Sequence, residues 1–216
     1  MTQPPPTLPD TLTDRLYLST LIARLENALL ASPSATRALE EWIALAPERI
    51  AAPLLVERTH EPATPCPAAF APLLGKAPLH YRKIRMTCGP LVLSEAENWY
   101  RPDLLNTDMQ QALDTTDIPF GRAVHALGFF RQTLARESLW WPLPQETLSR
   151  AQLQTLRAGT DRQTAPQENL PASPPSGIAL PAHLFRHTAL LRTQAGRPFS
   201  LVAETYTAQS LWPFLG

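Results

Sequence analysis

HYRKIRMTCGPLVLSEAENWY, residues 80–100, is the stretch that decides the fold. Apolar and polar side chains alternate on both sides of a Cys-Gly-Pro break at residues 88–90, which is the pattern of two strands joined by a tight turn. Successive residues of a strand point to opposite faces, so Arg82 shares its face with Ile84 and Met86. The opposite face is mainly polar, and we interpret it as the solvent side. An arginine therefore lies on the face that the alternation predicts to be buried.

A buried guanidinium without a counter-charge is costly, so Arg82 needs an anion. The closing strand offers a carboxylate, because Glu204 shares its face with Val202 and Tyr206. One interpretation is an internal Arg82–Glu204 salt bridge, or strand-end positions at which both side chains reach water. The other is a buried pocket for an anionic ligand, in which Arg82 clamps a carboxylate and Glu204 acts as acid, base or hydroxyl acceptor. The spacing leaves both interpretations open.

Along the whole chain, the sequence pattern predicts helices first and then mostly antiparallel strands. Apolar residues at helical spacing predict a helix over 11–30, and a second helix runs from Ser34 until Pro47 stops it. The other predicted elements are a strand at 54–59, a short helix at 107–113, a strand at about 128–137, and a second hairpin formed by 184–193 and 199–206. This order is typical of an α+β fold.

Proline usage predicts how the domain is bounded. The 24 prolines among 216 residues are roughly twice the usual share of about 5%. Residues 1–10 form a proline-rich tail, residues 60–78 an irregular crossing segment, and residues 142–180 a proline-containing insertion with little apolar periodicity. We therefore expect one domain at 11–216 that the insertion interrupts.

Composition excludes several classes of protein. The 19 basic and 19 acidic side chains balance, so no global field gathers nucleic acid or an anionic membrane, and a small ligand or a protein partner is favoured. No stretch approaches the ~18 apolar residues of a membrane span, and the first residues lack the pattern of a signal peptide. Cys66 and Cys88 are too few and too unpatterned for a disulfide framework. We expect a cytoplasmic monomer with two reduced thiols and no membrane span.

Motifs for common cofactors are missing from the sequence. It contains no G-x-S-x-G elbow, P-loop or G-x-G-x-x-G, which argues against a hydrolase, a nucleoside triphosphatase and a dinucleotide enzyme of the usual kinds. The five histidines show no spacing typical of metal ligands. We expect neither a metal nor another cofactor.

Short segments of the chain resemble the chorismate lyase (chorismate–pyruvate lyase) family in order and context. They are residues 81–85 (YRKIR), 118–122 (IPFGR), 196–198 (GRP) and 203–205 (AET), and residues 29–37 also resemble that family's leucine-rich helix and the helix start that follows it. The resemblance covers most of the chain outside the tail and the insertion. It implies a six-stranded antiparallel sheet with flanking helices around an internal ligand pocket.

The resemblance also implies a reaction and a set of site residues. The reaction converts chorismate to 4-hydroxybenzoate and pyruvate, as in ubiquinone biosynthesis, without a metal or redox cofactor. Arg82 matches the arginine that binds the ring carboxylate, and Glu204 matches the catalytic glutamate. Phe120 matches a residue that offers its backbone amide, and Leu55 matches a further backbone contact. The partner is then a small aromatic or cyclic carboxylate.

Two further expectations accompany this resemblance. The same fold serves as a small-molecule sensing domain on helix-turn-helix repressors, so binding of a small aromatic carboxylate without chemistry is the alternative function. The closing hairpin is one residue longer between Pro198 and Glu204 than in that family. Glu204 therefore faces the interior only if a β-bulge absorbs the extra residue.

Overall fold

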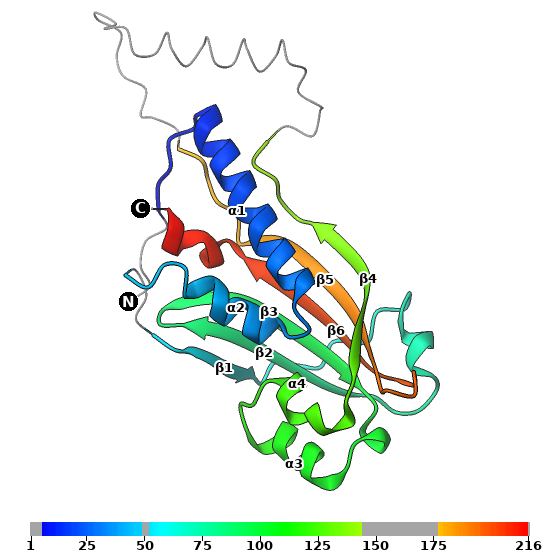
Figure 1. Ribbon diagram of the computed structural model, residues 1–216. Coiled ribbons are helices and arrows are strands. Elements are labelled where there is room, and N and C mark those ends of the chain that lie inside the picture. The colour runs from blue at the N-terminus through cyan, green and yellow to red at the C-terminus, as the bar shows by residue number, and fades with distance from the viewer. Residues whose placement is uncertain (1–5, 49–51, 144–176, 216) are drawn as a thin grey trace, which may run out of the picture.

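The computed structural model describes residues 6–48, 52–143 and 177–215. Residues 1–5 of the predicted tail and residues 144–176 of the predicted insertion lie outside the described residues. Helices, a central sheet and the two predicted hairpins account for most of the rest (Figure 1).

A six-stranded antiparallel sheet forms the centre of the fold, with the strand order β1-β2-β3-β6-β5-β4. The strands are β1 (Leu54–Thr59), β2 (His80–Cys88), β3 (Leu91–Tyr100), β4 (Phe130–Ser138), β5 (His183–Arg192) and β6 (Pro198–Thr207). The two predicted hairpins are β2–β3 and β5–β6, and they lie side by side because β3 pairs with β6. The predicted α+β fold with a six-stranded antiparallel sheet and flanking helices is confirmed.

Helices cover one face of this sheet (Figure 1). They are α1 (Leu12–Ala31), α2 (Ala35–Ile43), α3 (Thr107–Thr115) and the short α4 (Phe120–Ala123). The described chain also forms the 3-10 turns η1 (Ala71–Leu74), which lies on the opposite face, η2 (Pro102–Leu104), η3 (His125–Leu127) and η4 (Ala208–Phe214). The side chains of Thr11, Ser34 and Asn106 accept hydrogen bonds from amides in the first turns of α1, α2 and α3. These caps satisfy amides that would otherwise lack partners and so fix where each helix begins.

Two apolar clusters fill the space between the helices and the sheet. In the α1–α2 cluster, Leu25 of α1 and Trp42 of α2 belong to the same buried group as Tyr206 of β6. In the α3–α4 cluster, Leu113 of α3 belongs to the same buried group as Phe199 of β6. Each helix pair therefore covers a different part of the same sheet face, and the polar residues described below lie between the two clusters.

The opposite face of the sheet is covered by the crossing segment that the prolines predict. Leu74 of η1 forms a third buried cluster with Trp99 and Leu201, and Phe70 packs against it. The Trp99 indole also donates a hydrogen bond to the Thr64 carbonyl at 2.7 Å. An irregular segment can thus close one face of the sheet without forming a strand or a long helix.

The structure also places residues of the predicted tail and insertion in the core. Leu8 pairs with Ile178 in an isolated bridge, and both side chains are buried in the α1–α2 cluster. The core therefore begins before residue 11, and it resumes before residue 180. Single apolar residues between prolines carry no periodicity, so this contact could not be predicted from the sequence pattern.

None of the helices in the described part of the chain combines the length and the apolar composition needed to cross a membrane.

The anchoring of α1 can be tested by truncating one buried side chain. Leu25 is fully buried in α1, whereas Leu16 of the same helix is 43% exposed. We expect Leu25→Ala to lower the free energy of unfolding by about 2–5 kcal/mol, because the substitution leaves a cavity. The matched control Leu16→Ala should change it by less than about 0.5 kcal/mol. Urea denaturation measures both, and equal effects would contradict this packing.

Candidate functional site

A row of polar side chains crosses the helix-covered face of the sheet between the two apolar clusters. We call it the polar row, and it consists of Arg82 (β2), Asn98 (β3), Glu204 (β6), His187 (β5) and Arg131 (β4). The register supports one shared face, because Arg82 lies opposite Asn98, and Glu204 lies opposite His187. All of these residues except the half-buried Arg131 are buried. Polar groups on adjacent strands at this depth need specific partners.

Arg82 is 2% exposed, as the strand alternation predicts. Its Nη2 donates hydrogen bonds to the carbonyls of Ile118 at 2.8 Å and Thr116 at 3.2 Å. Its Nε and Nη1 are buried and have no hydrogen-bond partner among the described residues. Burial lowers the pKa of Arg82, and the neighbouring charge of Arg58 lowers it further, yet a guanidinium stays protonated at neutral pH.

A second arginine binds the same loop. Arg58 of β1 donates hydrogen bonds from Nη1 to the carbonyls of Leu113 and Asp114, at the C-terminal end of α3. Carbonyls at a helix C-terminus lack partners within the helix and carry partial negative charge, so cations are favourable there. Both arginines therefore bind the end of α3 or the loop that follows it. For Arg82 this structural contact uses only Nη2 of its three guanidinium nitrogens.

Glu204 is not paired with Arg82. Its Oε2 lies 2.6 Å from Nη2 of Arg131 and accepts a hydrogen bond from the Tyr206 hydroxyl at 3.2 Å. The register places Glu204 two strands away from Arg82 and two residues along, which is about 12 Å between their Cα atoms. The internal Arg82–Glu204 salt bridge, one of the two interpretations of the sequence, is therefore wrong. A nearer arginine from β4 neutralises the carboxylate instead.

The surroundings of Glu204 fix its ion pair. Burial alone would lower the pKa of Arg131, but the charge and the hydrogen bond of Glu204 raise it above its ordinary value. Burial also raises the pKa of Tyr206 well above its ordinary value, so its hydroxyl remains a donor.

The β5–β6 pairing contains a register shift between Leu191 and Arg192. This bulge lies near Pro198, as expected, and Glu204 faces the buried side.

Phe120 lies close to Arg82 through the loop that precedes it. Its side chain is buried at the start of α4, with its ring centroid 5.2 Å from that of Tyr100 and 6.4 Å from that of Phe199. Because Arg82 binds the carbonyl of Ile118, this loop runs directly past the guanidinium. The structure therefore brings Arg82 and the Phe120 loop together, and it adds an aromatic wall that the sequence did not single out.

Leu55 lies elsewhere. Its side chain on β1 is 54% exposed, and its register partner is Thr87. Thr87 is five residues along β2 from Arg82, which corresponds to about 17 Å. The structure does not bring Leu55 together with the polar row, because the register of β1 sets it near the opposite end of the strand.

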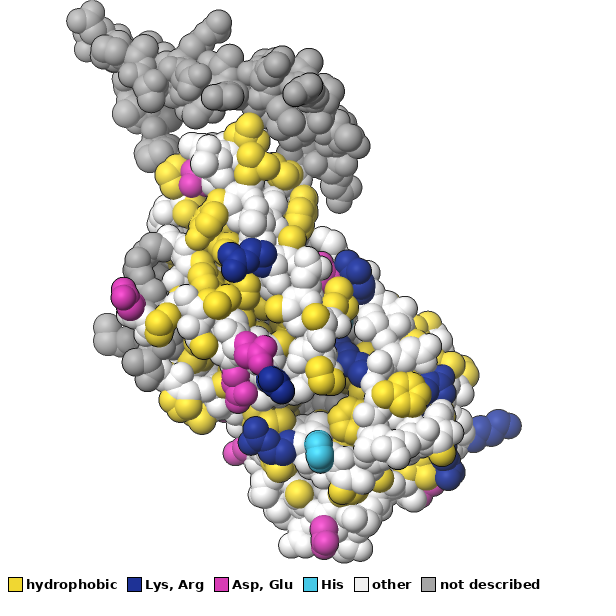
Figure 2. All heavy atoms as spheres, viewed as in Figure 1, with side chains coloured by type: hydrophobic (Ala, Val, Ile, Leu, Met, Phe, Trp, Pro, Cys, Tyr) yellow, Lys and Arg dark blue, Asp and Glu magenta, His cyan; other side chains and the backbone are white. Residues whose placement is uncertain are grey.

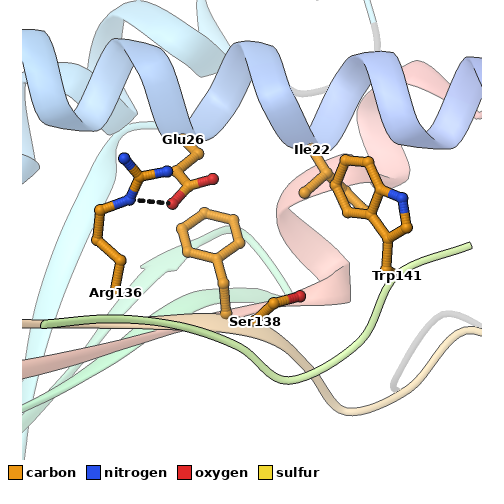
Figure 3. A pocket seen from close by; sticks show the side chains of 6 residues that line it. Ile22, Glu26, Arg136, Ser138 and Trp141 are labelled. Carbon is orange, nitrogen blue, oxygen red and sulfur yellow. Dashed lines mark hydrogen bonds and ion pairs between the residues drawn. The ribbon is translucent and has the colours of Figure 1, made fainter. Parts of the chain in front are cut away.

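Two cavities lie on the described part of the protein, and Arg82 of the polar row lines one of them. One, of about 250 Å³, is lined by residues at the end of β1 and the start of β2, among them Arg58, Tyr81 and Arg82. The other, of about 300 Å³, lies between α1 and the strands β4 and β5 (Figure 3).

No group of three or more His, Cys, Asp or Glu side chains in the described ranges could hold a metal ion. Figure 2 shows acidic and basic side chains interspersed over the helix-covered side, in line with the balanced charge.

Sequence reasoning missed Arg131 and treated His187 only as a possible metal ligand. His187 is fully buried, and its Nε2 lies 3.1 Å from Oε1 of Glu26 on α1. Strand alternation could have found His187, because it shares its face with Phe185 and Ala189. Helical spacing could have found Glu26 in the same way, because it lies four residues after the buried Ile22.

An α+β protein with a buried polar row across an antiparallel sheet is the class that these observations define. The chain belongs to the same family as the uncharacterized protein y4mC of Sinorhizobium fredii (strain NBRC 101917 / NGR234), with 35% identity over 205 residues that cover 92% of this chain and 78% of y4mC. No family model matches the sequence.

Solved structures offer only remote similarity. The possible transcriptional regulator YydK of Bacillus subtilis subsp. subtilis str. 168 matches with a TM-score of 0.38 and 13% identity, over 73% of this chain and 58% of YydK. A GntR-family transcriptional regulator from Bacillus cereus matches with a TM-score of 0.37 and 7% identity, over 72% of this chain and 92% of that protein. The chain thus spans little more than half of YydK, and similarity at this level carries no argument about function.

The Arg131–Glu204 pair can be tested by removing one charge and then both. Arg131→Met leaves the Glu204 carboxylate buried without its counter-charge and should lower the free energy of unfolding by about 3–5 kcal/mol. The double variant Arg131→Met/Glu204→Gln should lose less than the single variant, because no charge then remains uncompensated. The control is Arg136→Met on the same strand, whose side chain is 57% exposed in its pair with Glu26, and it should cost less than about 1 kcal/mol. Denaturant unfolding measures these free energies. A double variant that is less stable than Arg131→Met would contradict the pairing.

Proposed function

We propose that this protein binds the carboxylate of chorismate at Arg82 and, with Glu204, converts chorismate to 4-hydroxybenzoate and pyruvate. One observation carries the proposal: Nε and Nη1 of the buried Arg82 have no hydrogen-bond partner among the described residues. Burying a donor of a charged group without a partner costs free energy that a ligand carboxylate would recover. Charge-assisted hydrogen bonds of this kind are also among the stronger ones in proteins.

The separation of Arg82 and Glu204 suits a ring that carries polar groups at opposite ends. Both side chains rise from the same face of the sheet, and Asn98 and Val202 lie between them in the register. Arg82 would hold the ring carboxylate, and Glu204 would hold the ring hydroxyl. One polar and one apolar side chain lie between the two charged groups, and a small cyclic acid would fit this spacing better than an extended chain would.

Aromatic residues close the Arg82 end of this proposed site. The rings of Tyr100, Phe120 and Phe199 form one group, with centroids 5.2 Å and 6.4 Å from that of Phe120. Burial raises the pKa of Tyr100, so its hydroxyl stays neutral beside the arginine. Apolar walls strengthen the attraction between a guanidinium and a carboxylate because they exclude water.

The reaction proposed here needs proton movement but no change of oxidation state supplied from outside. The ring carbon that carries the hydroxyl loses its proton, and the electron pair of that C–H bond becomes the new ring double bond. The neighbouring C–O bond breaks, and the released enolpyruvate becomes pyruvate as it takes up a proton. Glu204 would hold the hydroxyl and receive the ring proton, while Arg82 keeps the ring in place.

Binding without chemistry is the second candidate, and the Arg131–Glu204 pair favours it. The Glu204 carboxylate already binds Arg131 at 2.6 Å, so one of its oxygens is occupied by a protein partner instead of being free for a substrate. In this alternative Arg82 still binds the ligand carboxylate, and Glu204 serves only to accept a hydrogen bond from the ligand.

Incubation with chorismate separates the two candidates. The wild-type protein should release pyruvate and 4-hydroxybenzoate in equal amounts, and Glu204→Gln should lower kcat roughly 100-fold or more, because a positioned acid or base typically contributes about that much. Glu97→Gln is the control, since Glu97 lies on the neighbouring strand β3, opposite Ala203, but accepts its hydrogen bond from Tyr81. Saturable binding of 4-hydroxybenzoate without turnover would establish the second candidate instead.

Calorimetric titration with 4-hydroxybenzoate tests the role of Arg82. Arg82→Met should weaken binding roughly 10- to 100-fold, as expected for the loss of hydrogen bonds to a charged group worth about 1.5–3 kcal/mol. Arg85→Met is the matched control from the same strand, because Arg85 pairs with Glu95 outside the polar row. Arg82→Lys serves as a second variant if Arg82→Met does not fold, and it should also bind more weakly. Wild-type affinity in both folded variants, or no binding by the wild-type protein, would overturn the assignment.

A further inference from the structure

His187 is a buried titratable group that the proposed reaction has not used. It lies directly opposite Glu204 in the pairing of β5 with β6, so the two side chains are neighbours on one sheet face. Its exposed fraction is 0%, and its ring lies 5.1 Å from that of Phe185 and 5.6 Å from that of Tyr206. These rings fix the orientation of the imidazole, as a group that exchanges protons with a neighbour requires.

The hydrogen bonds of His187 assign its proton. Glu26 accepts a hydrogen bond from Arg136 at 3.1 Å and lies equally far from Nε2 of His187. Figure 3 shows the Glu26 carboxylate reaching from α1 toward Arg136. A carboxylate in an ion pair only accepts hydrogen bonds, so Nε2 must carry the hydrogen. A neutral His187 then has an unprotonated Nδ1.

Nδ1 of His187 has no hydrogen-bond partner among the described residues, although it is buried. A carboxylate that orients an imidazole and stabilises its charged form, with the second ring nitrogen left free, is the arrangement of a general base. Most buried histidines satisfy both nitrogens. The unsatisfied nitrogen therefore needs an explanation, and the register neighbour Glu204, which makes no direct hydrogen bond to it, is the group with which it could exchange a proton.

We propose that His187, oriented by Glu26, relays the proton of the reaction at Glu204. Glu204 takes the proton from the ring carbon and passes it to Nδ1 of His187, and the proton returns by the same path as enolpyruvate becomes pyruvate. Glu26 stabilises the imidazolium in between, and no proton is gained or lost overall. His187 acts through Glu204 and is a positioning residue in this scheme, which rests on the lyase function proposed above.

Several charged groups face His187 and set its protonation. They are Glu26 on α1, Glu204 and Tyr206 on β6, and Arg131 and Arg136 on β4. Burial lowers the pKa of His187, and the hydrogen bond and charge of Glu26 oppose that effect without cancelling it. His187 is therefore neutral at neutral pH and able to accept a proton, and it loses this ability as the pH falls through its pKa.

The pH dependence of kcat measures this relay. The wild-type protein should show an acidic limb below about 6.5, the ordinary pKa of histidine. His187→Gln keeps a donor for Glu26 but cannot carry a proton, so it should lower kcat roughly 100-fold and remove that limb, with KM changed less than about two-fold. Glu26→Gln removes the group that raises the pKa of His187 and should move the limb to lower pH.

Further measurements distinguish a proton relay by His187 from a purely structural role of His187. They also distinguish failure of the relay from failure of the proposed lyase function. His183→Gln on the same strand should leave kcat and the pH profile unchanged, because His183 is 41% exposed and faces Glu95.

Imidazole ¹⁵N NMR of the wild-type protein should show hydrogen on Nε2 of His187 and none on Nδ1 at neutral pH. Hydrogen on Nδ1, or a His187→Gln protein with wild-type kcat and pH profile, would overturn the relay while the lyase function stands. If His187→Gln does not fold, Glu26→Gln with an unshifted limb overturns it. Absence of turnover by the wild-type protein would instead overturn the proposed function, and the relay with it.

Discussion

A guanidinium buried on the inner face of the sheet is the constraint on which this structure depends. Arg82 can occupy the inner face of β2 only because the loop after α3 turns its carbonyls toward it, and Arg58 binds the same loop from β1. These contacts hold α3, α4 and the Phe120 loop against the end of the sheet. They still leave two guanidinium nitrogens without partners among the described residues, and the proposed site uses those two donors.

The polar row divides the core into two parts. On one side α1 and α2 pack over an apolar cluster, and on the other α3 and α4 cover a second cluster. An ion pair connects two members of the row, Arg131 and Glu204, and a hydrogen bond connects His187 of the row to Glu26 on α1, a residue far away in the chain. Such pairs contribute little net stability when buried, but breaking one is costly. The net stability that the row adds to the fold is therefore small, which is compatible with the proposed role in binding a polar ligand.

Strand alternation predicted the inner positions of Arg82 and Glu204, because a period of two assigns a face to every residue once one face is known to be buried. The family resemblance added a condition, that Glu204 faces inward only if a bulge absorbs one extra residue of the closing hairpin, and the β5–β6 pairing contains a register shift beside Leu191. The partners of these groups were not predictable in the same way. Arg131 reaches Glu204 from a strand whose pairing with β5 contains its own register shift, and the carbonyls that bind Arg82 come from a loop without periodicity. Partners that lie on other strands or in loops depend on the tertiary fold, which local patterns do not encode.

A crystal structure of the protein with 4-hydroxybenzoate tests the central claim most directly. We expect a ligand carboxylate oxygen within about 2.7–2.9 Å of Nε or Nη1 of Arg82, the usual length of a charge-assisted hydrogen bond. We also expect the ligand hydroxyl on the Glu204 side of the polar row. A ligand bound elsewhere at full occupancy, with both Arg82 nitrogens hydrogen-bonded to protein or water, would contradict the account.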